Sequence, residues 1–335
     1  MLTYAVRRTA WMLLILLVIT VITFVLSRVI PANPAVFVAG YGASKAEVAA
    51  ITHQLGLDKP LYVQYFTYLG GLLHLDFGNS IRTGRPVGAD LRTYLPATLE
   101  LIVYSFVIYL LIALPLGMLA ALKRGSAVDL IVRGVAMIGS AAPIFWLAMI
   151  LQLLLFSYLG LLPIGGRLDI GQAPPPTVTG FYTIDSLLAG DPTLFAASVQ
   201  HLILPVVTIV LSQLAVGTRL MRSAMIQELR KQYVGTARSK GLTERQVVTR
   251  HVLRNALNPV VTMAGIQLGY LFAWIILVET IFQWPGIGLY AYQSFAALDY
   301  SPIMALTLVS SFAFVIINLV TDLIYPILDP RVGYR

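Results

Sequence analysis

The chain has 335 residues, of which 58% are hydrophobic and only 11% are charged, and its mean hydropathy is +0.81. This composition is too apolar for a soluble globular protein and predicts an integral membrane protein. The sequence has no cysteine, which excludes disulfides and thiolate chemistry, and its four histidines lack the H-E-x-x-H spacing of a zinc site. The net charge of +8 does not predict nucleic-acid binding, because most basic residues cluster in expected cytoplasmic loops.

The first apolar run covers residues 9–27 and follows Arg7 and Arg8. It is longer than the apolar core of a signal peptide and has no A-x-A cleavage site. We therefore expect residues 1–30 to form a retained transmembrane helix whose N-terminus lies in the cytoplasm.

Residues 31–95 are polar and mixed in charge. A segment of this length can cross the membrane despite its basic residues, because the positive-inside rule applies to short loops. We therefore expect a small extracytoplasmic domain. Within it, Ser44 followed by Glu47 predicts a capping box and a short helix that extends to about Leu55.

Residues 96–335 contain the remaining apolar runs. The second run has 22 uncharged residues, which span about 33 Å as a helix, and Pro143 predicts a kink in the third. The segment 160–199 is acidic and contains the stiff run APPP, so we expect it outside. The result is an all-α membrane protein of six transmembrane helices with both termini in the cytoplasm. The five runs after the first cover residues 101–122, 134–158, 200–218, 255–278 and 301–325.

The segment 219–259, between the fourth and fifth runs, is the most basic part of the chain. It carries nine Lys or Arg residues between Arg219 and Arg254, against only Glu228 and Glu244. This bias predicts a cytoplasmic loop. Gly241 is suited to the left-handed position after a helix, and Thr243 with Gln246 predicts a capping box that begins the next helix. The loop is therefore predicted to fold as two short helices.

The run YVGTARSKGLTERQVVTRHVLRNALNP resembles the cytoplasmic EAA loop of permease subunits from ABC importers, in the variant of the dipeptide, oligopeptide and nickel group. The phrases LGLDKPLYVQY, LDFGNSIRTGRPV, LPATLEL and ETIFQWPGIG are similar to the same group, so the resemblance covers nearly the whole chain. Its EAA triplet falls on Gly235, Thr236 and Ala237, and its glycine on Gly241. The missing acidic residue and the missing proline in 251–254 are departures that the peptide group shares, whereas Leu75 stands where the family usually has glycine.

In this family the short helix before the glycine is the coupling helix, which docks into a groove on a separate ATPase subunit. The resemblance therefore implies a set of ATPase-coupling residues, while it leaves the substrate-binding residues unknown. The implied residues are Val234, Gly235, Thr236, Ala237, Arg238, Ser239, Lys240, Gly241 and Leu242.

The resemblance implies a permease subunit of an ATP-driven importer for peptides or a related small solute in the bacterial cytoplasmic membrane. Its implied partners are a second, homologous permease, two ATPase subunits and an extracytoplasmic solute-binding protein. The chain has no G-x-x-x-x-G-K-[ST] phosphate loop, so ATP and Mg²⁺ are expected on the ATPase subunits and no catalytic or metal-binding residue is assigned here.

An ion-coupled secondary transporter is the alternative, and it requires ionisable groups near the membrane midplane. Glu100, Glu279 and Asp322 instead lie near the ends of expected spans, where we expect them to pair or to reach water. Trp284 is likewise expected at the membrane interface. A membrane enzyme is disfavoured because no motif such as G-x-S-x-G is present.

Overall fold

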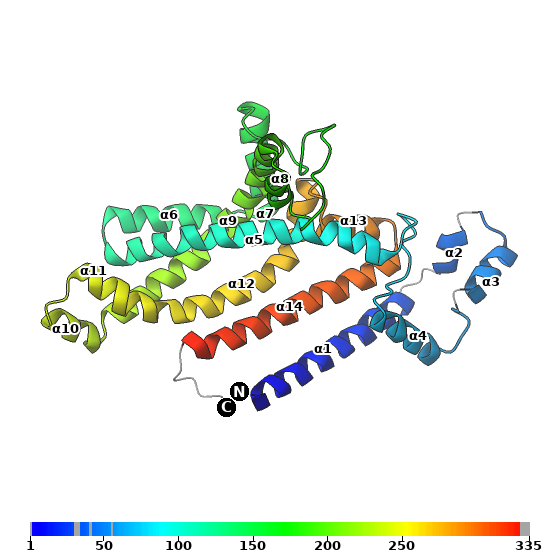
Figure 1. The fold of residues 1–335 in the computed structure, drawn as a ribbon, viewed down its shortest axis with the longest axis horizontal. Coiled ribbons are helices and arrows are strands. Elements are labelled where there is room, and N and C mark those ends of the chain that lie inside the picture. The colour runs from blue at the N-terminus through cyan, green and yellow to red at the C-terminus, as the bar shows by residue number, and fades with distance from the viewer. Residues whose placement is uncertain (1, 30–33, 40–41, 55, 329–335) are drawn as a thin grey trace. The chain divides into compact units, whose positions relative to one another are not determined.

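The computed structural model describes residues 2–29, 34–39, 42–54 and 56–328 (Figure 1). These residues form helices and connecting loops, and their only extended pairing is an isolated bridge between Asn79 and Pro86. The predicted all-α class is therefore confirmed. By their contacts the helices form two compact units, Met1–Leu95 with Gly286–Val315 and Pro96–Pro285 with Ile316–Arg335.

The first unit contains short helices and the N-terminal apolar helix. Ser44 donates its backbone N–H to Glu47 Oε2 at 2.7 Å, and Glu47 N–H donates to Ser44 Oγ at 3.3 Å. The predicted capping box is therefore confirmed, and the helix that it begins ends at Gln54, while Leu55 lies outside the described residues. The helices are α1 (Leu2–Val29), α2 (Pro34–Ala39), α3 (Lys45–Gln54), α4 (Leu61–Leu73), α13 (Ile287–Ala296) and the first part of α14 (Tyr300–Leu328).

Buried polar contacts attach the segment before α5 (Val87–Leu122) and the first turn of α5 to α13 and to the residue just before α14, within the first unit. Ser80 Oγ donates to Asp299 at 2.6 Å, and the Tyr290 hydroxyl donates to Asp90 at 2.9 Å. Both aspartates are buried. Because a buried carboxylate without partners is costly, these hydrogen bonds fix the loop over the helices.

The second unit is built around one long helix, α9, which packs against α6, α7, α8 and α12. A Cβ added to Gly139 of α6 would lie 2.6 Å from the carbonyl oxygen of Leu211, so glycine is what allows α6 and α9 to approach closely. Besides most of α5, the helices are α6 (Ala127–Ala141), α7 (Ile144–Leu151), η1 (Gln152–Tyr158), α8 (Tyr182–Leu188), α9 (Pro192–Leu229), α10 (Gln232–Ser239), α11 (Glu244–Gln246), η2 (Val247–Val252) and α12 (Leu253–Ile281).

Among the described residues, three to five helical segments are long and apolar enough to cross a membrane. The helices α5 and α9 and residues 300–321 of α14 qualify alone, and two bent pairs qualify together: α6 with α7–η1, and residues 244–272 with residues 274–281 of α12. The apolar part of α1, Thr9–Val25, is shorter. Each of the six predicted runs thus lies on helices, but length and composition establish only three to five spans.

The third run differs from its prediction. The predicted break at Pro143 is present, but α6 and α7–η1 are bent by 101° (Figure 1). Ala142, just before the proline, has extended backbone angles (φ −85°, ψ 138°), as expected when the proline ring disfavours a helical preceding residue. Residues 134–158 are therefore not one kinked helix but two helices that run in different directions.

The two acidic residues near the outer span ends are also placed differently. Glu100 and Glu279 were expected to pair or to reach water, and both are fully buried. Glu100 accepts hydrogen bonds from the Arg167 guanidinium and from the N–H and hydroxyl of Thr183, the last two at 3.0 and 2.7 Å. Glu279 accepts one from the hydroxyl of Thr98. The expected pairing is confirmed for Glu100, and both carboxylates have hydrogen-bonding partners inside the protein instead of reaching water.

Trp284 is not at a lipid interface either. Its side chain is 1% exposed and its Nε1–H donates to the carbonyl oxygen of Ala97 at 2.9 Å. The indole therefore packs inside the second unit, because its polar group finds a backbone partner there. The side chain of Asp322 and the tail 329–335 lie outside the described residues.

Candidate functional site

The short helix α10 lies with α11 at one end of the second unit, beside the ends of α9 and α12 (Figure 1). It begins after Lys231, whose backbone is extended, and it has two opposite faces. Val234 and Ala237, three residues apart, are buried, whereas Gly235, Thr236 and the residues 238–240 are exposed. The spacing of the two apolar residues matches one turn of helix, so α10 has a single inward stripe and a polar outer face.

The turn after α10 has the geometry of a Schellman motif. Gly241 has a φ of +79°, and its N–H donates to Arg238 O at 2.9 Å, while Leu242 N–H donates to Ala237 O at 3.4 Å. These are the two bonds that the motif requires, with glycine in the left-handed position. The predicted left-handed backbone conformation of Gly241 at the end of the helix is confirmed.

The next helix begins with the predicted capping box. Gln246 N–H donates to Thr243 Oγ1 at 3.4 Å, and Thr243 N–H donates to Gln246 Oε1 at 3.0 Å. Across the turn, Arg238 Nε and Nη2 donate to the Glu244 carboxylate at 2.6 and 3.2 Å. This hydrogen bond and the attraction to Glu244 raise the pKa of Arg238 above its ordinary value. Two caps and one ion pair therefore fix the angle between α10 and α11.

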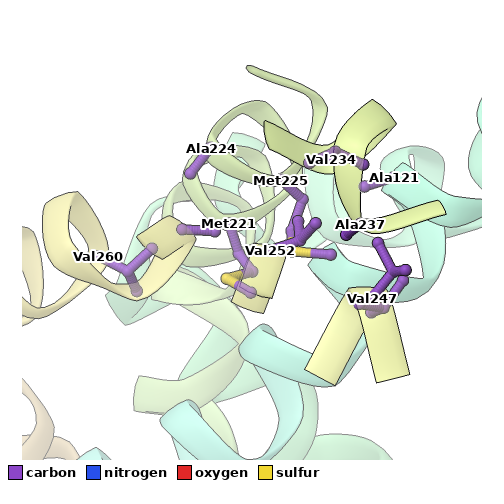
Figure 2. Packing of buried hydrophobic residues seen from close by; sticks show 11 residues of the cluster. Ala121, Met221, Ala224, Met225, Val234, Ala237, Val247, Val252 and Val260 are labelled. Atoms are coloured by element: carbon purple, nitrogen blue, oxygen red, sulfur yellow. The ribbon is translucent and has the colours of Figure 1, made fainter. Parts of the chain in front are cut away.

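Beneath α10 lies an apolar cluster that joins α10 to α5, α9, η2 and α12 (Figure 2). Val234 and Ala237 belong to it together with Met221 and Met225 of α9. Burying a side chain the size of Val234 contributes about 1.5–3 kcal/mol, so the cluster holds α10 against the helices. The other members are Ala121, Ala224, Val247, Val248, Val252, Ala256 and Val260.

The nine residues of the predicted coupling set therefore divide into two groups. Val234 and Ala237 face the protein's own core, and Leu242 packs partly against it. Gly235, Thr236, Arg238, Ser239, Lys240 and Gly241 are exposed. At Gly235 an added Cβ would have no neighbour within 4 Å among the described residues. The exposed residues are thus the ones available to another molecule, and the buried ones hold them in place.

One contact between α9 and α6 was not predicted by the sequence analysis. Arg222 of α9 donates two hydrogen bonds to Asp129 in the first turn of α6, from Nε at 2.7 Å and from Nη2 at 2.8 Å. The two residues are 93 positions apart, so no local pattern joins them. The sequence does mark Asp129 locally. It lies three residues after Ser126, which is the spacing of an N-cap, and four residues before Arg133, which is one helical turn.

Comparison with known proteins adds to this geometry. The family described as "Binding-protein-dependent transport system inner membrane component" matches residues 113–334, and the N-terminal family of the same type of system matches residues 1–86. The "Probable D,D-dipeptide transport system permease protein DdpB" of Escherichia coli (strain K12) is 45% identical over 98% of this chain and 96% of its own. The "Di/tripeptide transport system permease protein DppB" of Pseudomonas aeruginosa (strain UCBPP-PA14) is 40% identical over the full length of both chains.

A solved structure shares the fold of most of the chain. A chain of the MetNI methionine ABC transporter in an inward-facing conformation aligns with a TM-score of 0.54, covering 71% of this chain and 96% of that chain. The identity is 17%, so this likeness concerns the fold alone.

Proposed function

The chain belongs to the family of binding-protein-dependent transport system inner membrane components, and we propose that it serves an ATP-driven importer of short peptides. As a member of this family it is a membrane permease of an ABC importer, and ATP is hydrolysed by separate subunits. An ion-coupled secondary transporter is therefore set aside. Short peptides are proposed as the cargo because the dipeptide and di/tripeptide permeases match over nearly all of both chains.

We propose that α10 is the point at which the ATPase subunit acts on this chain. The observation that carries the proposal is the division of its two faces. Val234 and Ala237 bind α10 to the core of α9 and η2, while its outer face is polar and exposed. A displacement of the outer face is thereby passed to the long helix α9, because the interior of a protein is close-packed.

The proposed topology has six spans, with both termini in the bacterial cytoplasm and residues 31–95 outside. It is supported by the three unbent apolar helices, the two bent pairs and the shorter apolar helix of α1. The orientation is supported by the nine basic residues between Arg219 and Arg254, because such loops stay inside.

The proposed complex contains this chain, a second homologous permease, two ATPase subunits that bind ATP and Mg²⁺, and an extracytoplasmic solute-binding protein. Substrate would pass between the two permeases in the bilayer. Gly235 supports a close approach by a partner, since a glycine at an exposed helical position costs about 1 kcal/mol relative to alanine and no contact in the described part of the chain requires it.

Reconstitution in liposomes tests the proposal. With the second permease, the ATPase subunits, the binding protein and ATP, we expect uptake of a labelled dipeptide. The chain alone should take up none under an imposed proton or sodium gradient. Uptake by the chain alone would contradict the proposal and favour an ion-coupled mechanism.

A further inference from the structure

The contact between Arg222 and Asp129 joins two helices by a pair of charge-assisted hydrogen bonds. The Asp129 side chain is 2% exposed and that of Arg222 is 20% exposed. Both carboxylate oxygens receive a guanidinium N–H, at 2.7 and 2.8 Å. Bidentate pairs of this kind fix direction as well as distance, so the contact sets how α6 and α9 lie against each other.

Asp129 is itself held rigidly on α6. Gly125 N–H donates to its Oδ2 at 3.0 Å, and its own N–H donates to the capping hydroxyl of Ser126 at 3.5 Å. Arg133, one turn further along the same helix, lies 3.4 Å from Oδ1. The carboxylate therefore cannot turn away from Arg222 without losing its hydrogen bond from Gly125 N–H and its contact with Arg133.

On the side of α9 the contact is adjacent to the cluster beneath α10. Arg222 follows Met221 directly, and Met225 is one turn later; both methionines belong to the cluster that buries Val234 and Ala237. The residue of α9 that contacts α6 and the residues of α9 that pack against α10 thus lie within the same two turns of α9.

The rest of the inward face of α6 consists of Val132, Ala136 and Gly139. Small apolar residues allow close packing, but they do not oppose sliding along the helix axis as a directional contact does. The bidentate contact is the polar link that the structure describes between α6 and α9 near this end.

We propose that Arg222 and Asp129 are positioning residues for energy coupling, which make α6 move with α9 when α10 is displaced. This inference rests on the proposed role of α10. With the contact intact, a push on α10 moves both helices. Without it, α9 moves while α6 lags behind, so ATP is consumed with little transport.

The test is made on the complete importer in liposomes, by measuring both ATP hydrolysis and dipeptide uptake. Asp129→Asn and Arg222→Gln should each lower the dipeptide transported per ATP by about ten-fold, within the usual range of coupling between sites, while ATP hydrolysis continues. The double variant Asp129→Arg/Arg222→Asp should recover part of the ratio, which a purely structural loss of either residue would not predict.

Arg133→Gln is the matched control. It removes another cation from Asp129, but Arg133 lies on α6 itself and its side chain is 44% exposed, so the link between helices remains and the ratio should not change. If a single variant fails to accumulate in the membrane, Arg222→Lys is measured in its place. Lysine keeps the positive charge but loses the bidentate geometry, so the dipeptide transported per ATP should fall partially.

An unchanged ratio in Asp129→Asn or Arg222→Lys, or an equal loss in Arg133→Gln, would overturn the inference. Failure of the proposed function itself is distinguishable, because the unmodified complex would then show no ATP-dependent uptake.

Discussion

Leu242 donates its backbone N–H to the carbonyl oxygen of Ala237 at 3.4 Å, across the left-handed Gly241. Ala237 is buried in the cluster beneath α10, so this bond fastens the end of the helix to the core. The orientation of the outer face of α10 therefore depends on the left-handed conformation of Gly241, together with the cluster beneath α10 and the Arg238–Glu244 pair.

Gly241→Val should disturb this turn without unfolding the protein. A β-branched residue in the left-handed conformation costs on the order of 1–2 kcal/mol, and none of the described residues lies within 4 Å of the added Cβ to cause a clash. We expect normal amounts of protein in the membrane and a loss of ATP-driven transport by the complex. Gly241→Asn is the control, because asparagine tolerates this conformation and should keep most of the transport. Normal transport by Gly241→Val would contradict the role given to the turn.

Glu100→Gln should destabilise the second unit strongly. The change leaves the Arg167 guanidinium buried without its charged partner, and breaking a buried pair in this way costs about 3–5 kcal/mol. The measurement is the thermal unfolding midpoint of the purified chain in detergent. Asp169→Asn is the control, because Asp169 contacts His201 at 3.2 Å but its side chain is 61% exposed, and exposed pairs contribute about 0–1 kcal/mol. Equal shifts in the two variants would show that burial of Glu100 is not decisive.

Leu75→Gly should keep or raise stability. Leu75 has a φ of +58° and an exposed side chain, at the position where the resembled family usually has glycine. Relief of the left-handed strain is worth about 1 kcal/mol, offset in part by the greater entropy of the unfolded chain. Leu73→Gly, at the last residue of α4, is the control and should lower the unfolding midpoint. A lower midpoint for Leu75→Gly would mean that its side chain contributes more than its exposure suggests.

The topology is tested by single cysteines, since the chain has none of its own. Cysteines at Ser44 and Thr177 should react with an impermeant maleimide in intact cells, and those at Arg124 and Ser239 only after permeabilisation. All four positions are exposed. In the loop before α6 the cysteine is placed at Arg124, because the nearby exposed Ser126 caps α6 and its replacement would disturb that helix. Labelling of Ser239→Cys from outside would contradict the six-span arrangement.

Sequence reasoning succeeded where the determinants are local. The capping boxes at Ser44 and Thr243 and the turn at Gly241 each depend on residues at most five positions apart. The residue types at those positions are therefore enough to predict them. The contacts between Arg222 and Asp129 and between Arg167 and Glu100 join residues 93 and 67 positions apart, which one sequence does not relate.

The predictions that failed did so because they depend on contacts between residues far apart in the sequence. Pro143 indicates a break, because it removes a backbone donor, but the proline by itself does not specify the 101° angle between α6 and α7–η1. Glu100 was expected at the interface because it lies near the end of an expected span, and its partner, Arg167, lies far away in the acidic segment 160–199. Neither residue alone shows that folding buries the pair.

The central claim is that the exposed face of α10 meets an ATPase subunit, and cysteine cross-linking in the assembled complex tests it most directly. Ser239→Cys, on the outer face, should cross-link to cysteines in the groove of the cognate ATPase, with a yield that changes when ATP is trapped. Ala237→Cys, on the buried face of the same helix, should not cross-link. If no exposed position from 235 to 241 cross-links to any ATPase subunit, α10 is not the coupling helix and the basic loop serves only to orient the chain in the membrane.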